Sequence, residues 1–376
     1  MKRILIIFFV FILIQAVVSQ ESSGPGKPHV DQRVELLSIA FRLAGNPEYS
    51  SRKFKLYTDR IEHHFAAYKS HELIIFIQKL RKKNGVSFDA VMSMAVHIDN
   101  PPGFSPLVVF SKEIPDERWG KENAVKFIEL LKKFYADAGC ESFFRENEDL
   151  YEEASRRFLK VYETLDAGWY SKFYGKEPNE EFIIVNGLGN GGGNYGPSIQ
   201  FSNGKRKVYA VMGTWTTDSL GMATFAVKDY FPTLLHEFNH SFVNYLVEKY
   251  RNELNQSGEK LFRAVKSEMN QQAYRDWETM IKESLVQAAV IKYMKDHLFD
   301  PCDIDQEKAR QLKRGFTWIG ELTEELENYD KQREKYPTLE SYMPAIVTAF
   351  KAYARDIQKM LQATRIAEKS SAPENK

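Results

Sequence analysis

Cysteine is scarce in this chain, which has only two in 376 residues, Cys140 and Cys302. Structural zinc sites need closely spaced pairs of cysteine, so two thiols in distant segments exclude a metal site of that kind. The two could form a disulfide if the chain is exported to an oxidising compartment. Two unpaired thiols are the open alternative.

The chain also lacks an excess of charge of either sign, with 52 basic and 51 acidic residues. Without a net positive field or a dense basic block, nothing in the composition favours a nucleic-acid partner. Long apolar runs are absent after the first twenty residues. We therefore expect no stable membrane span once the N-terminal segment is removed.

That N-terminal segment has the pattern of an export signal. Residues 1–3 are Met-Lys-Arg, residues 4–14 are almost purely apolar, and small or branched residues lead up to Ser19. The pattern predicts a signal peptide over residues 1–19 with cleavage near Ser19, and a secreted or periplasmic protein. An uncleaved membrane anchor is the alternative, although the apolar run is short for one.

The remaining chain predicts an α+β fold that is predominantly helical. Residues 20–175 carry helical spacing of apolar residues and form a mainly helical N-terminal region. Residues 301–365 are expected to form a helical C-terminal region, and residues 366–376 a disordered tail. Residues 176–300 between them are expected to form the core that carries the candidate site residues.

Short runs of β-type residues mark the beginning of that core. Residues 182–185, 198–201 and 207–212 read as strands, and Asn203-Gly204 is a hairpin turn between the last two. We expect a small antiparallel sheet just before the helix over residues 230–250.

A glycine-rich loop at residues 187–196 follows the first strand. Its start fits the pattern G-x-G-x-x-G, which binds dinucleotides only where a helix begins directly after it. Here Tyr195, Gly196 and Pro197 follow, and they do not open a helix. We expect no nucleotide partner and interpret the loop as the border of a cleft.

Residues 236–240 (HEFNH) lie on the predicted helix and fit the pattern H-E-x-x-H. Positions four apart share one face of a helix, so His236 and His240 can reach the same metal ion. Glu237 can take a proton from water made acidic by zinc. The alternative is that both histidines are structural residues of a buried helix, with hydrogen-bond partners in the core.

Catalytic zinc needs a third protein ligand, and two glutamates on a later helix are candidates. Glu283 lies in a run of core-type residues, where a charge must be paired or bound to metal. Glu278 lies in a more polar turn. We therefore predict zinc bound by His236, His240 and Glu283.

The pattern H-E-x-x-H with a downstream Glu283 resembles the glutamate-zincins, the thermolysin-type metallopeptidases. Residues 182–293 are also similar to secreted bacterial proteins known as a domain of unknown function with a zincin site. The resemblance implies a zincin-like fold, Zn²⁺ on His236, His240 and Glu283, and Glu237 as the base. In many such enzymes an aspartate supports a histidine where this chain has Gln287, whose oxygen can accept a hydrogen bond.

We therefore expect a zinc metallopeptidase acting on a peptide or protein. A non-catalytic exported binding protein on a zincin scaffold is the alternative, and hydrolysis of another bond by the same residues is a third possibility. Residues 207–212 or the segment around Tyr195 would pair with substrate as an edge strand. Tyr195 and Tyr342 are candidates for stabilising the oxyanion.

Overall fold

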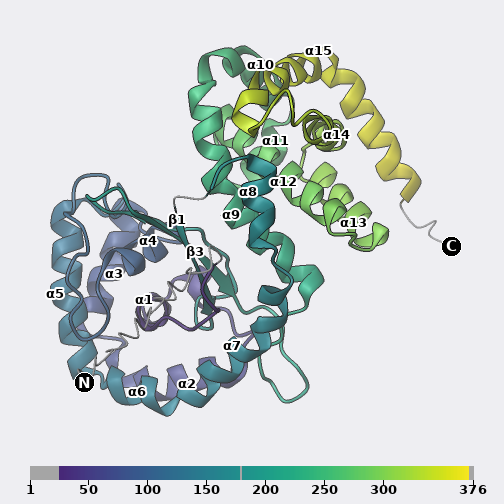
Figure 1. Ribbon diagram of the computed structural model, residues 1–376. Coiled ribbons are helices and arrows are strands. Elements are labelled where there is room, and N and C mark those ends of the chain that lie inside the picture. The colour runs from purple at the N-terminus through teal and green to yellow at the C-terminus, as the bar shows by residue number, and fades with distance from the viewer. Residues whose placement is uncertain (1–24, 178–179, 372–376) are drawn as a thin grey trace, which may run out of the picture.

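The computed structural model describes residues 25–177 and 180–371, so the predicted signal peptide lies outside the described residues. Helices surround a small three-stranded sheet, with the first half of the chain at lower left and the second half at upper right (Figure 1). The strands and short 3-10 helices are β1 (Glu180–Gly187), β2 (Ser198–Gln200), β3 (Arg206–Gly213), η1 (Pro47–Tyr49) and η2 (Ala66–Tyr68).

The α-helices account for most of the described chain, which confirms the predominantly helical α+β prediction. They are α1 (Gln32–Leu43), α2 (Lys55–Phe65), α3 (Glu72–Asn84), α4 (Asp89–His97), α5 (Lys121–Asp137), α6 (Cys140–Glu146), α7 (Glu148–Glu163), α8 (Ala167–Tyr174), α9 (Val227–Lys249), α10 (Arg251–Ala264), α11 (Lys266–Gln271), α12 (Trp277–Asp296), α13 (Pro301–Lys313), α14 (Ile319–Asp330) and α15 (Leu339–Ser371).

The sheet has the order β1-β3-β2 and is mixed, which corrects the prediction of an antiparallel sheet. Strands β2 and β3 are antiparallel, as the Asn203-Gly204 turn predicted. Strand β1 instead pairs with β3 in parallel, from Glu180 opposite Arg206. The loop after β1 carries the chain across to the far side of β3, so the hairpin returns beside β1 in the same direction.

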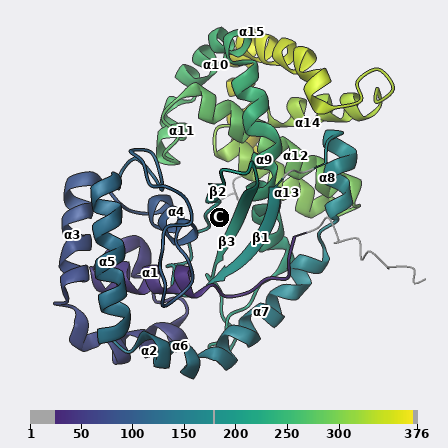
Figure 2. The same cartoon turned by 60° about the vertical axis from the view of Figure 1, so that its left-hand side comes forward.

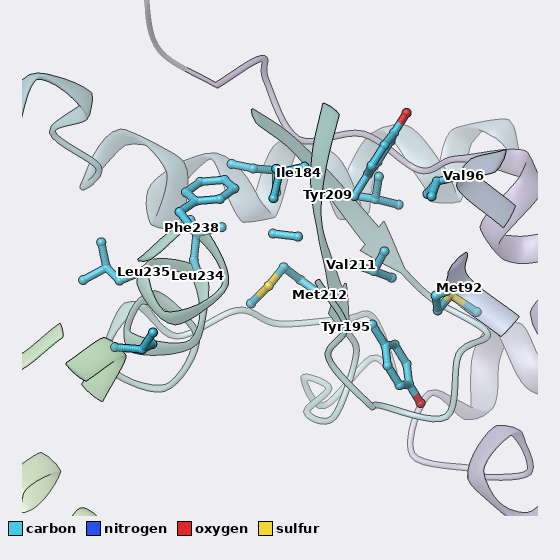
Figure 3. Packing of buried hydrophobic residues seen from close by; sticks show 14 of the residues in the cluster. Met92, Val96, Ile184, Tyr195, Tyr209, Val211, Met212, Leu234, Leu235 and Phe238 are labelled. Atoms are coloured by element: carbon cyan, nitrogen blue, oxygen red, sulfur yellow. The ribbon is translucent and has the colours of Figure 1, made fainter. Parts of the chain in front are cut away.

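Side chains of the sheet alternate between its two faces, and both faces are covered (Figure 3). Ile184 and Met212 lie on the side of Leu234 and Phe238 from α9, while Tyr209 and Val211 lie on the side of α4. All of these side chains are buried. Burial of each such side chain contributes about 1.5–3 kcal/mol, so the sheet fixes α9 firmly against one of its faces. Figure 2 shows α9 and α12 on that side of the strands.

Helix α15 extends to Ser371, so residues 366–371 are helical where a disordered tail was predicted, and residues 372–376 lie outside the described residues. The tail was predicted from its polar composition. A helix that is already anchored propagates at little cost, and residues such as Ala, Glu, Lys and Arg favour it. Within the described ranges, we find no helix with the length and apolarity of a membrane span.

The two cysteines are both free, which decides between the alternatives left open above. Cys140 is buried at the start of α6, whereas Cys302 is exposed near the start of α13. The thiols are therefore available for separate chemical tests.

Candidate metal centre

Helix α9 presents His236, Glu237 and His240 on one partly accessible face. The opposite face is apolar, and Leu235 and Phe238 on it are buried. The helical repeat therefore separates the core-forming residues from the polar ones and brings the two imidazoles together. Their ring centroids lie 4.7 Å apart.

The carboxylate of Glu283 on α12 meets these imidazoles, because α12 packs against α9. The Nε2 atoms of His236 and His240 are 3.1 Å apart. Glu283 Oε2 is 3.6 Å from Nε2 of His236, and its Oε1 is 3.4 Å from Nε2 of His240. A tetrahedral zinc ion with bonds of about 2.0–2.1 Å separates its ligand atoms by about 3.3 Å. The three residues therefore fit a single zinc ion.

The other candidate ligand, Glu278, is engaged elsewhere. Its carboxylate forms ion pairs with Lys282 at 2.9 Å and with Arg251 at 2.9 Å. The structure therefore brings Glu283, and not Glu278, to the two histidines.

Neighbouring groups contact two of the three candidate ligands, His240 and Glu283. Asn244, one turn after His240, lies with its Oδ1 3.1 Å from Nδ1 of that histidine. The hydroxyl of Tyr274 donates a hydrogen bond of 2.8 Å to Oε2 of Glu283. Burial, reinforced by the charges of His240 and Arg314, holds the pKa of His236 well below its usual value. A neutral imidazole is the form that binds a metal.

The carboxyl group of Glu237 lies beside the ligands and beneath Gly196. A β-carbon at position 196 would lie only 2.2 Å from Oε2 of Glu237. Burial raises the pKa of Glu237 to about 7, while His240 opposes that rise. The glycine-rich loop is thus in direct contact with the predicted base.

A cleft of about 620 Å³ adjoins this face of α9. Its walls come from the glycine-rich loop, the segment after β3, the beginning of α9 and helix α13, represented by Gly192, Asn194, Trp215, Thr233, Glu307 and Arg310. Thr233 lies three residues before His236, on the same side of the helix. None of His236, Glu237, His240 and Glu283 lines the cleft, which ends one turn of α9 before His236. The interpretation of the loop as the border of a cleft is consistent with the structure.

A buried carboxylate holds the beginning of the glycine-rich loop through backbone hydrogen bonds. The backbone N–H groups of Leu188 and Gly189 donate to the two carboxylate oxygens of Glu35, at 2.7 and 2.9 Å. These are the amide groups that a phosphate would need in a dinucleotide site. Here they bind a buried carboxylate of α1.

The two tyrosines considered for the oxyanion lie elsewhere. Tyr195 is adjacent to Gly196, so its side chain points to the opposite face of the strand. It lies on the side of Met92, facing Tyr49 (Figure 3). The hydroxyl of Tyr342 donates to Glu325 at 2.6 Å. Each hydroxyl therefore has a partner outside the candidate ligand group.

Sequence reasoning missed several residues around the candidate ligands, most of them from beyond residues 176–300. Tyr274 precedes α12, and Glu307, Arg310, Gln311 and Arg314 lie on or directly after α13. Nothing in their local spacing marks them, since polar residues at these positions are ordinary on a helix. Their roles depend on how α13 packs against α12. A buried glutamine such as Gln311 becomes informative only after that packing is known.

The comparisons with known proteins identify one family. The model of the family described as Domain of unknown function (DUF4932) matches residues 28–349. No curated protein and no solved structure matches the chain. The match spans the helical N-terminal region, the sheet, the candidate metal centre and α13.

Proposed function

The chain belongs to the family described as Domain of unknown function (DUF4932), and we propose that it is an exported zinc metallopeptidase of the glutamate-zincin type. The convergence of His236, His240 and Glu283 beside Glu237 carries this proposal. Two imidazoles and one carboxylate are a donor set typical of catalytic zinc, which keeps a fourth position open for reaction. The pattern of residues 1–19 supports export.

Zinc, when bound by these residues, would supply a Lewis acid that polarises a carbonyl and makes water acidic. His236, His240 and Glu283 would hold the ion, with Asn244 and Tyr274 fixing the orientation of His240 and Glu283. Glu237 would take the proton from the attacking water and pass it to the leaving amine. The adjoining cleft would admit the substrate from the side of Thr233 and Arg310.

A peptide suits this site because an exposed strand edge lies next to Glu237. Tyr195 and Val211 exchange both backbone hydrogen bonds, at 3.0 and 2.8 Å. In such an antiparallel pair the backbone groups of the next residue, Gly196, point away from β3. Gly196 is exposed. A substrate strand could therefore pair with this segment, whereas β3 lies between two strands and is not available.

Cleavage of a peptide library by the zinc-loaded chain tests the proposal. We expect Glu237→Gln to retain zinc and lose about 10²–10⁴-fold in cleavage rate, since general-base catalysis contributes that much. Glu248→Gln, an exposed position on the same helix, is the matched control and should cleave like the wild type.

Two results would contradict the proposal. Equal cleavage by Glu237→Gln and wild type would refute the role of Glu237. A wild type that binds zinc but cleaves no peptide would favour the binding protein or hydrolysis of another bond.

A further inference from the structure

A buried glutamine on α13, Gln311, is fixed from both sides by charged groups. Its Nε2 donates to Oε1 of Glu307 at 2.6 Å, and its Oε1 accepts from Nη1 of Arg314 at 3.0 Å. Glu307 is itself paired with Arg310, so its carboxylate only accepts hydrogen bonds. A guanidinium only donates. If the amide of Gln311 were inverted, its oxygen would face the carboxylate of Glu307. Its N–H groups would face the guanidinium of Arg314.

The fixed orientation of Gln311 determines that of Gln287 on α12. Nε2 of Gln311 lies 3.0 Å from Oε1 of Gln287 and donates its second proton there. The other end of the Gln287 amide, Nε2, therefore faces His236, at 2.8 Å from Nδ1. Amide orientation is ordinarily chosen from the hydrogen-bond network, and here two charged residues dictate it.

Gln287 thus offers an N–H donor to Nδ1 of His236. A histidine that binds metal through Nε2 carries its proton on Nδ1, so it needs an acceptor at that position. A neutral imidazole that accepts at Nδ1 carries its proton on Nε2. That proton would point toward Nε2 of His240, 3.1 Å away. His240 can accept it because Oδ1 of Asn244 accepts the proton on Nδ1 of His240. Each contact along this path from Gln311 to Asn244 therefore pairs a donor with an acceptor.

We propose that Gln311 and Gln287 are positioning residues that hold His236 in the tautomer unfavourable to zinc, and so weaken metal binding at this site. The inference rests on the proposed function, because it concerns the same ligands. It reverses the expectation that Gln287 simply accepts a hydrogen bond from His236.

Zinc binding through Nε2 of His236 then requires a rearrangement with a definite proton balance. The Nε2 proton leaves to solvent and one proton is taken up at Nδ1, so the ring stays neutral. Gln287 must invert to accept from Nδ1, which turns its own Nε2 toward Nε2 of Gln311. The unfavourable donor-to-donor contact lowers the affinity for zinc.

Two substitutions should relieve this contact in different ways. Gln287→Glu supplies a carboxylate that accepts from His236 and Gln311 together. Gln311→Met removes the donor that fixes Gln287 and adds no charge. We expect each to tighten zinc binding by about tenfold or more, the scale on which outer-shell groups act on zinc sites. Gln306→Glu and Gln306→Met, at an exposed position of α13, should leave zinc affinity unchanged.

Zinc dissociation constants of the full chain, measured by competition with a chelator, give the first readout. Nitrogen NMR of the imidazoles in metal-stripped protein gives the second. It should place the proton of His236 on Nε2 in the wild type and on Nδ1 in Gln287→Glu. The NMR result decides even if Gln311→Met fails to fold.

Weaker or unchanged zinc binding in Gln311→Met, or a wild-type His236 protonated at Nδ1, would overturn the inference. Failure of both the wild type and Gln287→Glu to bind zinc would instead refute the proposed function on which it rests.

Discussion

Gly196 covers the carboxylate of Glu237 so closely that a β-carbon at position 196 would lie 2.2 Å from its Oε2. Real β-carbons do not approach an oxygen so closely, so either the loop or the glutamate must move if a side chain is added. The contact joins the exposed strand edge to the predicted base. It explains why the glycine-rich loop, and not only α9, shapes this side of the site.

Substituting this glycine should separate base function from metal binding. We expect Gly196→Ala to displace Glu237 and lower peptide cleavage by about a hundredfold, because misplacing a catalytic group by about 1 Å can cost that much. Zinc affinity should stay within about twofold of wild type, since the three ligands are not in contact with position 196. Cleavage assays and chelator competition on the same preparation measure the two effects.

Gly320→Ala is the matched control, because a β-carbon there meets no atom within 4 Å. It should leave both properties unchanged. Full cleavage activity in Gly196→Ala would contradict the close contact with Glu237.

The buried carboxyl of Glu35 should make stability depend on pH. Burial raises the pKa of this carboxyl to about 7, and the nearby charge of Asp31 adds to the rise. Hydrogen bonds from the backbone N–H groups of Leu188 and Gly189 and from the hydroxyl of Tyr57 lower the pKa and oppose it. In the unfolded chain the carboxyl has its ordinary pKa of 4.5. As pH rises from about 4.5 to about 7, the unfolded chain loses this proton first, so the folded state is progressively destabilised.

This loss is on the order of 3 kcal/mol, at about 1.4 kcal/mol for each unit of pKa difference. We expect denaturant unfolding to show it between about pH 4.5 and about pH 7 in the wild type. Glu35→Gln, which does not titrate, should show a smaller decline over the same range. An identical decline in both proteins would contradict the raised pKa of Glu35.

Local patterns predicted the parts of this molecule that depend on local geometry. The spacing of His236 and His240 sufficed to place them on one face, because the helical repeat is fixed. Asn203-Gly204 likewise predicted the β2–β3 hairpin. Glu283 was found because a charge in an apolar run needs a partner, and that reasoning also rests on nearby residues.

What the sequence could not predict depends on contacts between distant segments. The parallel pairing of β1 with β3 follows from the path of a long loop, which no turn signal encodes. Gln311 and Arg314 contribute only because α13 packs beside α12. The donor facing Nδ1 of His236 could not be inferred from Gln287 alone, since its orientation is determined by Gln311.

The two thiols provide a simple check of the packing in the N-terminal helices. Burial raises the pKa of Cys140 to about 12 and removes it from solvent, whereas Cys302 is exposed. We expect one thiol for each native chain to react rapidly with a maleimide, and Cys302→Ser to remove that reaction. The second thiol should react only after denaturation. Rapid labelling of Cys140 in the native chain would contradict its burial.

The zinc content of two glutamate variants tests the metal centre most directly. We predict one zinc for each wild-type chain, and the same for Glu278→Gln, whose carboxylate pairs with Lys282 and Arg251. Glu283→Gln should lose zinc after dialysis, because it removes the only carboxylate among the three ligands. A wild type without zinc, or a Glu283→Gln variant that retains it as firmly as wild type, would contradict the account.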